Sequence, residues 1–392
     1  MVLHLTWAFS IGFLTKMSDD GYRIFAGEMK VKDISACMEA FAPLAYQESY
    51  DNAGLICGSQ EAEINSVLLS LDCTEAVVDE AIALGCKLIV SHHPIVFSGM
   101  KKITGRTYAE RVIIKAIKND IALYAAHTNL DHVEQGVNGA IAEKLGLKNT
   151  RVLAPRSGIL RKLVTFCPVD KAAELRQALF AAGAGHIGNY DECSFNQEGF
   201  GTFRGNEISK PSVGEKLKTH QEKELKIEVI FSTEREGQIL DALKKAHPYE
   251  EVAYDLYPLE NSHPLVGSGL VGDLPEEAGE AAFLGRLKRV FRASVVRHTA
   301  FLGKNVRRVA VCGGSGSFLL GDAIASGAGV FVSADFKYHQ FFDADNKIVI
   351  ADIGHYETEQ FTPQIFSDII RKKFPIFAVH LSKINTNPVT YS

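Results

Sequence analysis

Short apolar runs alternate with longer amphipathic stretches over most of the chain, and each apolar run ends in polar or glycine-rich residues. Runs of this kind are typical of buried strands, and the amphipathic stretches are typical of helices that cover them. In the first half the predicted strands are Ser66–Leu71, Lys87–Val90 and Ala122–Ala126, and the predicted helices are Thr74–Leu84, Tyr108–Lys118 and Asn138–Leu145. This alternation predicts an α/β fold with a largely parallel sheet covered on both faces.

The C-terminal part of the chain repeats this order. The predicted strands are Arg308–Cys312, Val330–Ser333, Lys347–Ile353 and Ile376–Leu381, and the predicted helices are Phe318–Ala325 and Tyr356–Lys372. Residues 71–93 and 311–335 share a strand, a polar turn, a helix and a second strand that ends in ligand-type residues. The repeat predicts two similar α/β halves that form one core around a single cleft.

The stretch between these halves has a different pattern. Its predicted order is βαβ-β-αβ, with short, glycine-punctuated strands around Ser194–Phe203, which indicates an inserted ferredoxin-like α+β domain. The expected domains are an N-terminal extension at 1–28, the first half of the core at 29–158, the insert at 159–264 and the second half of the core at 265–392.

The first 28 residues are interpreted as a disordered extension or a misassigned start. Convincing amphipathic patterning begins only at Met29, and the apolar stretch Leu3–Leu14 has no Lys or Arg before it. That stretch is also too short to span a bilayer, so neither a targeting signal nor a transmembrane segment is expected.

Composition narrows the class of protein. Of the 392 residues, 46% are hydrophobic and 23% charged, as in globular domains. The net charge of −5 argues against nucleic acid or an anionic membrane as the main partner, although local basic surface leaves nucleic acid open as a minor alternative. The seven cysteines are scattered and never arranged as C-x-x-C, which favours a reducing cytoplasm over a disulfide framework or a zinc knuckle.

Two adjacent histidines, His92 and His93, follow a predicted buried strand and precede Pro94. Neighbouring side chains of a regular strand point to opposite faces, so both histidines serve one site only where the strand breaks. Pro94 favours such a break because it lacks an N–H group and has a fixed φ. Neutral imidazole is a good ligand for Zn, Fe or Mn, so the two histidines are candidate metal ligands. The alternative interpretation is that they lie in a solvent-exposed polar loop.

Three further candidates follow other predicted strands. His355 and Glu359 stand four residues apart at the start of a helix, so both project from one face; the alternative is an ordinary polar pair. Asp131 can supply a bridging carboxylate, or act as a turn residue before the next helix. Together with His92 and His93 these residues give five protein ligands, more than one tetrahedral ion with an open position needs. They fit two divalent ions (Zn, Fe or Mn), and such a pair could activate water for hydrolysis.

Other polar motifs are weaker. His339 is a candidate general acid or base, or a packed helix histidine, and Lys337 could meet an anionic group. The glycine-rich turn 313–317 could cradle a phosphate, but a tight strand–helix turn is favoured. The basic stretch 286–297 is interpreted as a solvated amphipathic helix, with a nucleic-acid face as the minor alternative. The segment His247–Glu251 resembles a turn before a strand, and its compact polar composition also suggests a site, whose chemistry the sequence does not specify.

Several motifs together resemble one family over residues 29–392. They are Ser91-His92-His93-Pro94, His127-Thr128-Asn129-Leu130-Asp131, Gly354-His355-Tyr356-Glu357-Thr358-Glu359 and Asn385-Thr386-Asn387-Pro388. They are similar, in order and in content, to those of the GTP cyclohydrolase 1 type 2 homolog family.

The resemblance implies a dinuclear metal site between two α/β halves. By motif match its ligands are His92, His93, Asp131, His355 and Glu359. The resemblance also implies a toroidal homohexamer and an insert of the PII-like or CutA-like kind that carries His247–Glu251. It places His127 and His339 beside the metals, where they could relay protons.

Three functions remain open at this point. The first is a metal-dependent hydrolase of a nucleotide or related heterocycle, in which activated water attacks C8 of guanine and formate leaves. The second is a non-catalytic protein that binds or delivers metal, or serves as a ring-shaped scaffold. The third is a nucleic-acid-associated ring, which steep salt dependence of binding would support.

Overall fold

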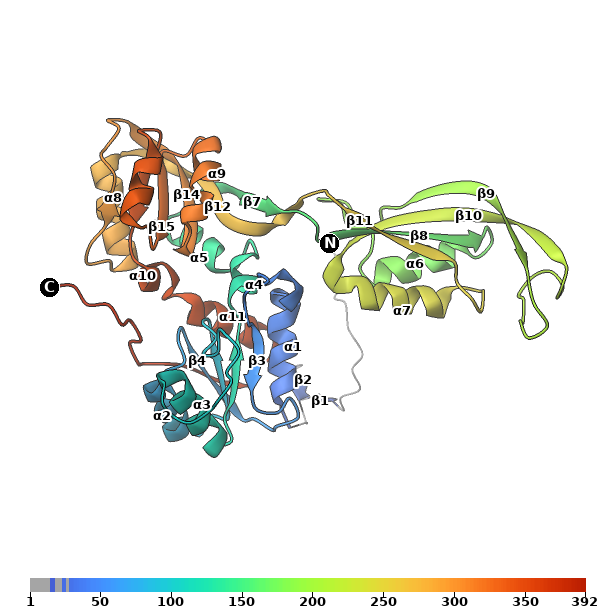
Figure 1. The fold of residues 1–392 in the computed structure, drawn as a ribbon, viewed down its shortest axis with the longest axis horizontal. Coiled ribbons are helices and arrows are strands. Elements are labelled where there is room, and N and C mark those ends of the chain that lie inside the picture. Colours follow the sequence, from blue (N-terminus) through green and yellow to red (C-terminus); the bar gives the residue numbers. More distant parts are fainter. Residues whose placement is uncertain (1–14, 18–22, 26–27) are drawn as a thin grey trace. The chain divides into compact units, whose positions relative to one another are not determined.

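The computed structural model describes residues 15–17, 23–25 and 28–392, and over these residues the protein is a mixed α/β structure with several sheets, as predicted (Figure 1). The prediction for residues 1–28 lies mostly outside the described residues; within it, β1 (Thr15–Met17) pairs antiparallel with β2 (Arg23–Phe25). The chain forms two compact units. Unit 1 contains the described residues up to Phe41, Ser49–His127 and Thr362–Thr390, and unit 2 contains Ala42–Glu48, Thr128–Phe361 and Tyr391–Ser392.

Unit 1 is built on a five-stranded sheet of order β17-β4-β5-β6-β3. The strands are β3 (Gly54–Cys57), β4 (Ser66–Ser70), β5 (Leu88–Ser91), β6 (Ala122–Ala125) and β17 (Ala378–Leu381). All neighbours are parallel except β3, which runs antiparallel to β6. Every residue of β4, β5 and β6 is buried, as expected for parallel strands that are covered on both faces.

Four helices pack in unit 1. They are α1 (Val31–Phe41), α2 (Glu75–Leu84), α3 (Tyr108–Lys118) and α11 (Thr362–Lys373). The helices α2 and α3 pack side by side and share a core with the sheet, whereas α11 packs against α1 and contacts β4 and β17. The Thr74 hydroxyl caps the start of α2, and Gly85, at φ +70°, ends it in the left-handed conformation.

Unit 2 contains a six-stranded sheet of order β13-β16-β15-β14-β12-β7. The strands are β7 (Lys148–Arg156), β12 (His263–Gly279), β13 (Arg297–His298), β14 (Asn305–Ser315), β15 (Val330–Ala334) and β16 (Val349–Asp352). The central strands β14, β15 and β16 are parallel, and the outer ones are antiparallel to their neighbours. The parallel carboxyl ends therefore meet at one edge of this sheet.

The helices of unit 2 outside the four-stranded sheet described below are mostly short. They are η1 (Leu44–Tyr46), α4 (Thr128–Asp131), α5 (Val137–Lys144), α8 (Glu280–Phe291), η3 (Ser317–Leu319), α9 (Leu320–Ala325), η4 (Tyr338–Ala344) and α10 (His355–Glu359). The prediction of one helix over Tyr356–Lys372 is wrong, because α10 ends at Glu359 and α11 begins at Thr362. Pro363 explains the break, since proline cannot donate the hydrogen bond that a continuous helix would need there.

A separate four-stranded antiparallel sheet in unit 2 has the order β11-β8-β10-β9 (Figure 1). Its elements are β8 (Leu160–Pro168), α6 (Ala172–Ala181), β9 (Phe195–Arg204), β10 (Thr219–Ser232), η2 (Thr233–Arg235), α7 (Glu236–Ala246) and β11 (Tyr254–Leu259). Both α6 and α7 cover one face and share a hydrophobic core with it. The chain order and strand order are those of ferredoxin-like folds, while its status as an inserted domain stays a prediction.

Some strands pair with strands that are distant from them in the sequence. The strand β17 comes from the last stretch of the sequence but pairs with β4 of the first sheet, and β7 pairs with β12. Of the described residues, none lies in a helix that is both long enough and apolar enough to cross a membrane. All seven cysteines, which lie in the described part, are free thiols.

Candidate metal centre

The two adjacent histidines of unit 1 lie where β5 leaves its sheet. The backbone N–H groups of His92 and His93 both donate to the carbonyl of Leu71, each over 3.0 Å. This pair of bonds to one carbonyl bends the chain out of the strand, and Pro94 follows directly. The two imidazole rings consequently lie together, with centroids 4.9 Å apart, as the strand-break hypothesis requires.

The hydrogen bond of His92 fixes its tautomer. His92 is buried, and its Nδ1 lies 2.8 Å from the carbonyl oxygen of Ala126. A carbonyl oxygen can only accept, so Nδ1 carries the proton and Nε2 of the neutral ring carries the lone pair. Nε2 is therefore the nitrogen that this ring can offer to a metal ion.

Carboxylates orient the two other imidazoles of this group. His93 Nδ1 donates to Asp72 Oδ1 over 2.7 Å, and His127 Nδ1 donates to Asp51 Oδ1 over 2.7 Å. Asp72 itself accepts a bond from the Thr386 hydroxyl, in the closing segment of the chain. A carboxylate on one ring nitrogen is the usual support for a histidine that binds metal through the other.

The three histidines form one group. The ring of His127 lies 5.2 Å from that of His92 and 5.5 Å from that of His93, and one nitrogen from each ring lies within 4.8 Å of the others. His127 was expected beside the metal ligands, and the structure places it among the imidazoles that could hold an ion. It reaches them because β6 lies next to β5 in the sheet.

Removing the carboxylate behind His93 should weaken metal binding. We expect Asp72→Ala to reduce metal affinity by about 10–100-fold, because the imidazole loses the group that fixes its tautomer and orientation. Competition with a chelator of known affinity measures this change. Asp79→Ala is the matched control, since Asp79 is exposed and pairs with Lys115 on the surface. Equal affinities of the two variants would show that Asp72 has no orienting role.

The candidates of unit 2 lie on the short helix α10. His355 Nε2 lies 3.1 Å from Glu359 Oε2, as expected for residues four apart on one helical face. His355 Nδ1 lies 2.7 Å from Asp335 Oδ2, so both ring nitrogens face carboxylates. Burial opposes the charged ring, but the bonds to Asp335 and Glu359 outweigh it and raise the pKa of His355 to about 11. This position therefore favours a positive charge.

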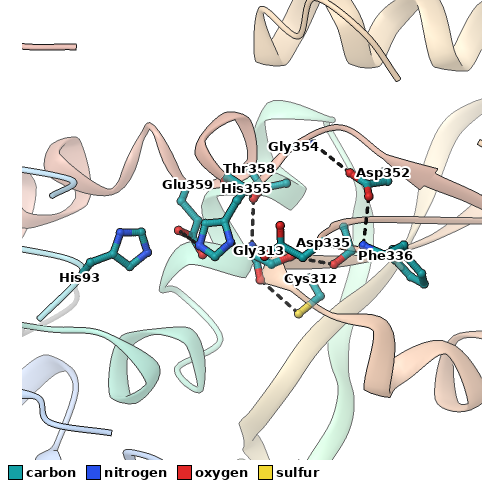
Figure 2. A network of polar contacts seen from close by, with 12 residues as sticks. His93, Cys312, Gly313, Asp335, Phe336, Asp352, Gly354, His355, Thr358 and Glu359 are labelled. Atoms are coloured by element: carbon teal, nitrogen blue, oxygen red, sulfur yellow. Dashed lines mark hydrogen bonds and ion pairs between the residues drawn. The ribbon is translucent and has the colours of Figure 1, made fainter. Parts of the chain in front are cut away.

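Asp352 forms hydrogen bonds both to the residue before α10 and to the residue after Asp335. Its buried carboxylate accepts from the N–H groups of Gly354 (3.2 Å) and Phe336 (3.1 Å), as Figure 2 shows. Arg297 Nη1 also donates to it over 3.1 Å. Burial raises the pKa of Asp352, and these three donors offset part of that effect. One side chain at the end of β16 thus orders the loops that carry His355 and its carboxylate partner.

The glycine-rich end of β14 brings the backbone close to His355 and Glu359. Gly314 has φ +58°, and its N–H donates to the Thr358 hydroxyl over 2.9 Å. A Cβ at this position would lie 2.4 Å from Glu359 Oε1 and 3.2 Å from His355 Nε2. The prediction of a turn over 313–317 is wrong for its first three residues, because β14 continues to Ser315, with a shift of its register against β15 after Val311. The two glycines of this strand end pack beside the candidate ligands.

Asp131 ends α4 and is linked through Asn138 to the same end of β14. Its carbonyl accepts from Asn138 Nδ2 over 2.9 Å, and Asn138 Oδ1 accepts from the N–H of Gly313 over 2.9 Å. Burial, and then the negative charges of Asp131 and Glu359, raise the pKa of the buried Cys312 thiol. The charges of both carboxylates therefore act on the same thiol near the end of β14.

The remaining catalytic candidate, His339, lies in η4 and is exposed. Its ring packs against Tyr338 and Phe342, with centroids 5.2 Å and 6.3 Å away. Lys337 is exposed too, and its N–H donates to Gln340 Oε1 at the start of η4. Within the described residues His339 is not part of the three-histidine group, and its role in proton transfer stays a prediction.

The raised pKa of His355 has a consequence for metal binding. Below about pH 11 the metal-free ring carries a proton that an ion must displace, so affinity should rise with pH, by roughly tenfold per unit if one proton is released. Titration of the metal-free protein with Mn²⁺ at several pH values between 6 and 8.5 measures the slope. A flat profile would show that His355 gives up no proton when the metal binds.

Comparison with known proteins agrees with the motifs. The sequence profile of Duf34/NIF3 (NGG1p interacting factor 3) matches residues 29–388. Two relatives, both called GTP cyclohydrolase 1 type 2 homolog, come from Halalkalibacterium halodurans and Bacillus subtilis. The first is 40% identical and covers 90% of this chain and 96% of its own length. The second is 38% identical and covers 92% and 98%.

Solved structures show the same fold. A Bacillus cereus protein related to NIF3 superposes with a TM-score of 0.81 at 38% identity, covering 94% of this chain and all of its own. A Staphylococcus aureus protein superposes with a TM-score of 0.74 at 30% identity, covering 93% of this chain and 99% of its own. The family resemblance drawn from the motifs is thereby confirmed, and the chain belongs to the Duf34/NIF3 family, whose members include the GTP cyclohydrolase 1 type 2 homologs.

Proposed function

We propose that the protein binds two divalent metal ions per chain and is a metal-dependent hydrolase of the GTP cyclohydrolase 1 type 2-like kind. The ligands in this proposal are His92, His93, Asp131, His355 and Glu359. The observation that carries it is the set of imidazoles in unit 1, each with Nδ1 held by an acceptor. Rings that are locked in this tautomer are prepared to bind an ion through Nε2.

The donor chemistry of unit 2 fits the same ions. His355 lies between two carboxylates that together hold an extra proton on the ring. Without metal, the extra proton supplies the positive charge that the two carboxylates favour. A bound divalent cation would supply that charge instead. Imidazole and carboxylate together suit Zn, Fe or Mn better than Ca or Cu(I).

The course of the chain also supports a shared site. His127 follows β6, and Asp131 ends α4 only four residues later. Even a fully extended chain keeps these two residues within roughly 14 Å. The short stretch of chain between them therefore limits the distance from His127 to Asp131, although the two residues belong to different units.

Ions held by these ligands would lower the pKa of a water molecule and neutralise charge that develops during hydrolysis. The residues of the chain would orient the site: Asp72 and Asp51 keep His93 and His127 in one tautomer, and Asp335 does the same for His355. His127 and His339 are the candidates for proton transfer. The names of the relatives point to a nucleotide or related heterocycle as substrate.

The experiment that tests this proposal combines elemental analysis with a GTP turnover assay. Purified protein is supplemented in turn with Zn²⁺, Fe²⁺ and Mn²⁺, and formate release from GTP is measured with and without a chelator. Two ions per chain with chelator-sensitive formate release would support the cyclohydrolase-like activity. Two ions without turnover would favour metal binding or delivery, or a scaffold role, over catalysis. Absence of stoichiometric metal would refute the proposed centre itself.

The proposal also includes the assembly and location expected from the resemblance, namely a toroidal homohexamer in the cytoplasm. Seven free thiols are in keeping with a reducing compartment. Analytical ultracentrifugation of the full chain should give six times the chain mass of 42.9 kDa. A monomer or dimer at micromolar concentration would contradict the hexamer.

A further inference from the structure

A cavity of about 730 Å³ lies on the four-stranded sheet, away from all the candidate metal ligands in sequence. Its wall is formed by β9, the loop after β9 that carries Lys210, the adjoining part of β10, Phe166 of β8, and the segment before β11 that carries Tyr249. A volume of this size is typical of sites for small organic molecules. Tyr249, Glu250 and Glu251 also line it, and they belong to the polar motif His247–Glu251 that the metal centre leaves unexplained.

The register of the strands places the lining residues on one face. Glu224 of β10 is paired with Gly199 of β9, and Lys226 is paired with Gln197 and with Phe166 of β8. Directly paired residues of antiparallel strands project to the same side. The neighbouring pairs thus make one surface, with Glu224 at its centre.

Two glycines of β9 leave the space next to this carboxylate open. A Cβ on Gly201 would lie 2.1 Å from Glu224 Oε2, so a side chain there would push the carboxylate aside. A Cβ on Gly199 would meet no atom within 4 Å, although its pair Glu224 lies directly across. Within this strand the missing side chains therefore keep room in front of Glu224.

Glu224 is a buried charged group with a defined orientation. Only 8% of the residue is exposed, and Oε1 accepts from the Tyr249 hydroxyl over 2.9 Å. Tyr249 is held by His247, whose Nδ1 accepts from the Tyr249 N–H (3.1 Å) and whose Nε2 donates to the Phe166 carbonyl (2.8 Å). Burial lowers the pKa of His247, so the neutral ring that these two bonds require is favoured.

The charges around the cavity favour a cationic ligand. Lys226, on the same face, forms an ion pair with Glu228 Oε1 over 2.5 Å, which offsets its positive charge. The other cations that line the cavity, Arg204 and Lys210, are exposed to solvent. Interactions of exposed charges are weakened by water, whereas those of a buried carboxylate are much stronger. Glu224 therefore dominates the electrostatic potential inside the cavity.

We propose that this cavity is a second binding site, for a planar aromatic or heterocyclic molecule that bears a cationic amidine-type group. Such a group can donate two hydrogen bonds to a carboxylate, which are charge-assisted and directional. The rings of Phe166, Phe203 and Tyr249 supply flat apolar surface, and aromatic rings attract cations. This site is independent of the metal centre and of its reaction.

Benzamidine is a direct probe, and benzoate is its anionic counterpart of the same shape. Isothermal titration of the full-length protein should show saturable benzamidine binding at millimolar concentrations and none for benzoate. Glu224→Gln, which keeps the shape but removes the charge, should weaken benzamidine binding at least tenfold. The matched control is Glu174→Gln on the exposed surface of α6, which should bind as the wild type does.

A second variant tests the cavity itself. A Cβ on Gly199 meets no atom within 4 Å, so Gly199→Phe introduces no clash at its Cβ and the fold should persist. Its ring would project to the face of Glu224, so benzamidine binding should be lost. Circular dichroism and thermal unfolding verify the fold of each variant. The proposal is overturned if the wild type does not bind benzamidine, if Glu224→Gln binds it equally well, or if benzoate is preferred.

Discussion

Replacing His93 or Glu359 by alanine is expected to lower metal affinity by more than roughly 100-fold, and with it any metal-dependent turnover. Loss of an outer-shell partner already costs about 10–100-fold, and these variants remove a ligand atom itself. His93→Ala removes the imidazole that Asp72 orients, and Glu359→Ala removes the carboxylate that faces His355. Elemental analysis after gel filtration, together with chelator competition, measures the change.

The fold should survive both substitutions. His93 lies in a loop at the end of β5, and Glu359 lies in the last turn of α10, where its removal relieves negative charge beside Asp131. His186→Ala and Glu174→Ala are matched controls on exposed surface, and both should retain metal. If His93→Ala and Glu359→Ala kept full metal content with wild-type circular dichroism, the ligand assignment would be wrong.

Gly314→Ala is expected to abolish metal binding although alanine adds only one methyl group. The left-handed φ of +58° costs a non-glycine residue roughly 1–2 kcal/mol. The new Cβ would also lie 2.4 Å from Glu359 Oε1 and 3.2 Å from the His355 ring, so both side chains must move. Metal content and thermal unfolding, measured in parallel, distinguish displaced ligands from general destabilisation.

Gly303→Ala is the matched control for backbone strain. Gly303 has φ +72°, and a Cβ there would meet no atom within 4 Å. It should therefore show a similar loss of stability, roughly 1–2 kcal/mol, with unchanged metal content. Equal metal content in Gly314→Ala and Gly303→Ala would mean that close approach to Glu359 plays no part.

Much of the α/β architecture was readable from the chain. The strands β4, β5, β6, β15 and β16 are continuous apolar runs, and parallel strands covered on both faces produce that signal. The pattern over Tyr356–Lys372 predicts one helix, whereas the structure has two, α10 and α11, with Pro363 in the first turn of the second. The helical periodicity continues across this proline, whereas the missing hydrogen-bond donor breaks the helix in the structure.

Strands with weak patterns were harder to predict. The sequence pattern does not predict β7, because its residues are mostly exposed or half-buried at the edge of a sheet and Pro155 lies next to its last residue. The strand β9 forms one ten-residue strand despite its two glycines, where short separate strands were expected. Its pairing with β10 over its whole length overrides the weak intrinsic preference of glycine for strands.

Local chemistry was thus determined by the sequence alone. The break after Ser91 follows from Pro94, the common face of His355 and Glu359 follows from helical spacing, and the family follows from the order of the motifs. These are properties of neighbouring residues, and they need no knowledge of distant contacts.

Only the tertiary structure decided which distant residues support those candidates. Asp51, Asp72 and Asp335 each orient one imidazole from a separate segment, at sequence separations of 76, 21 and 20 residues. Asp72 and Asp335 follow parallel strands, whose carboxyl ends meet at one edge of a sheet, whereas Asp51 precedes β3, which is antiparallel to β6 and therefore begins at that same edge. The order of these strands is set by packing of the whole chain. The contact of Gly314 with Glu359 and the open space in front of Glu224 arise in the same way, since both depend on strands and helices that are brought together only by folding.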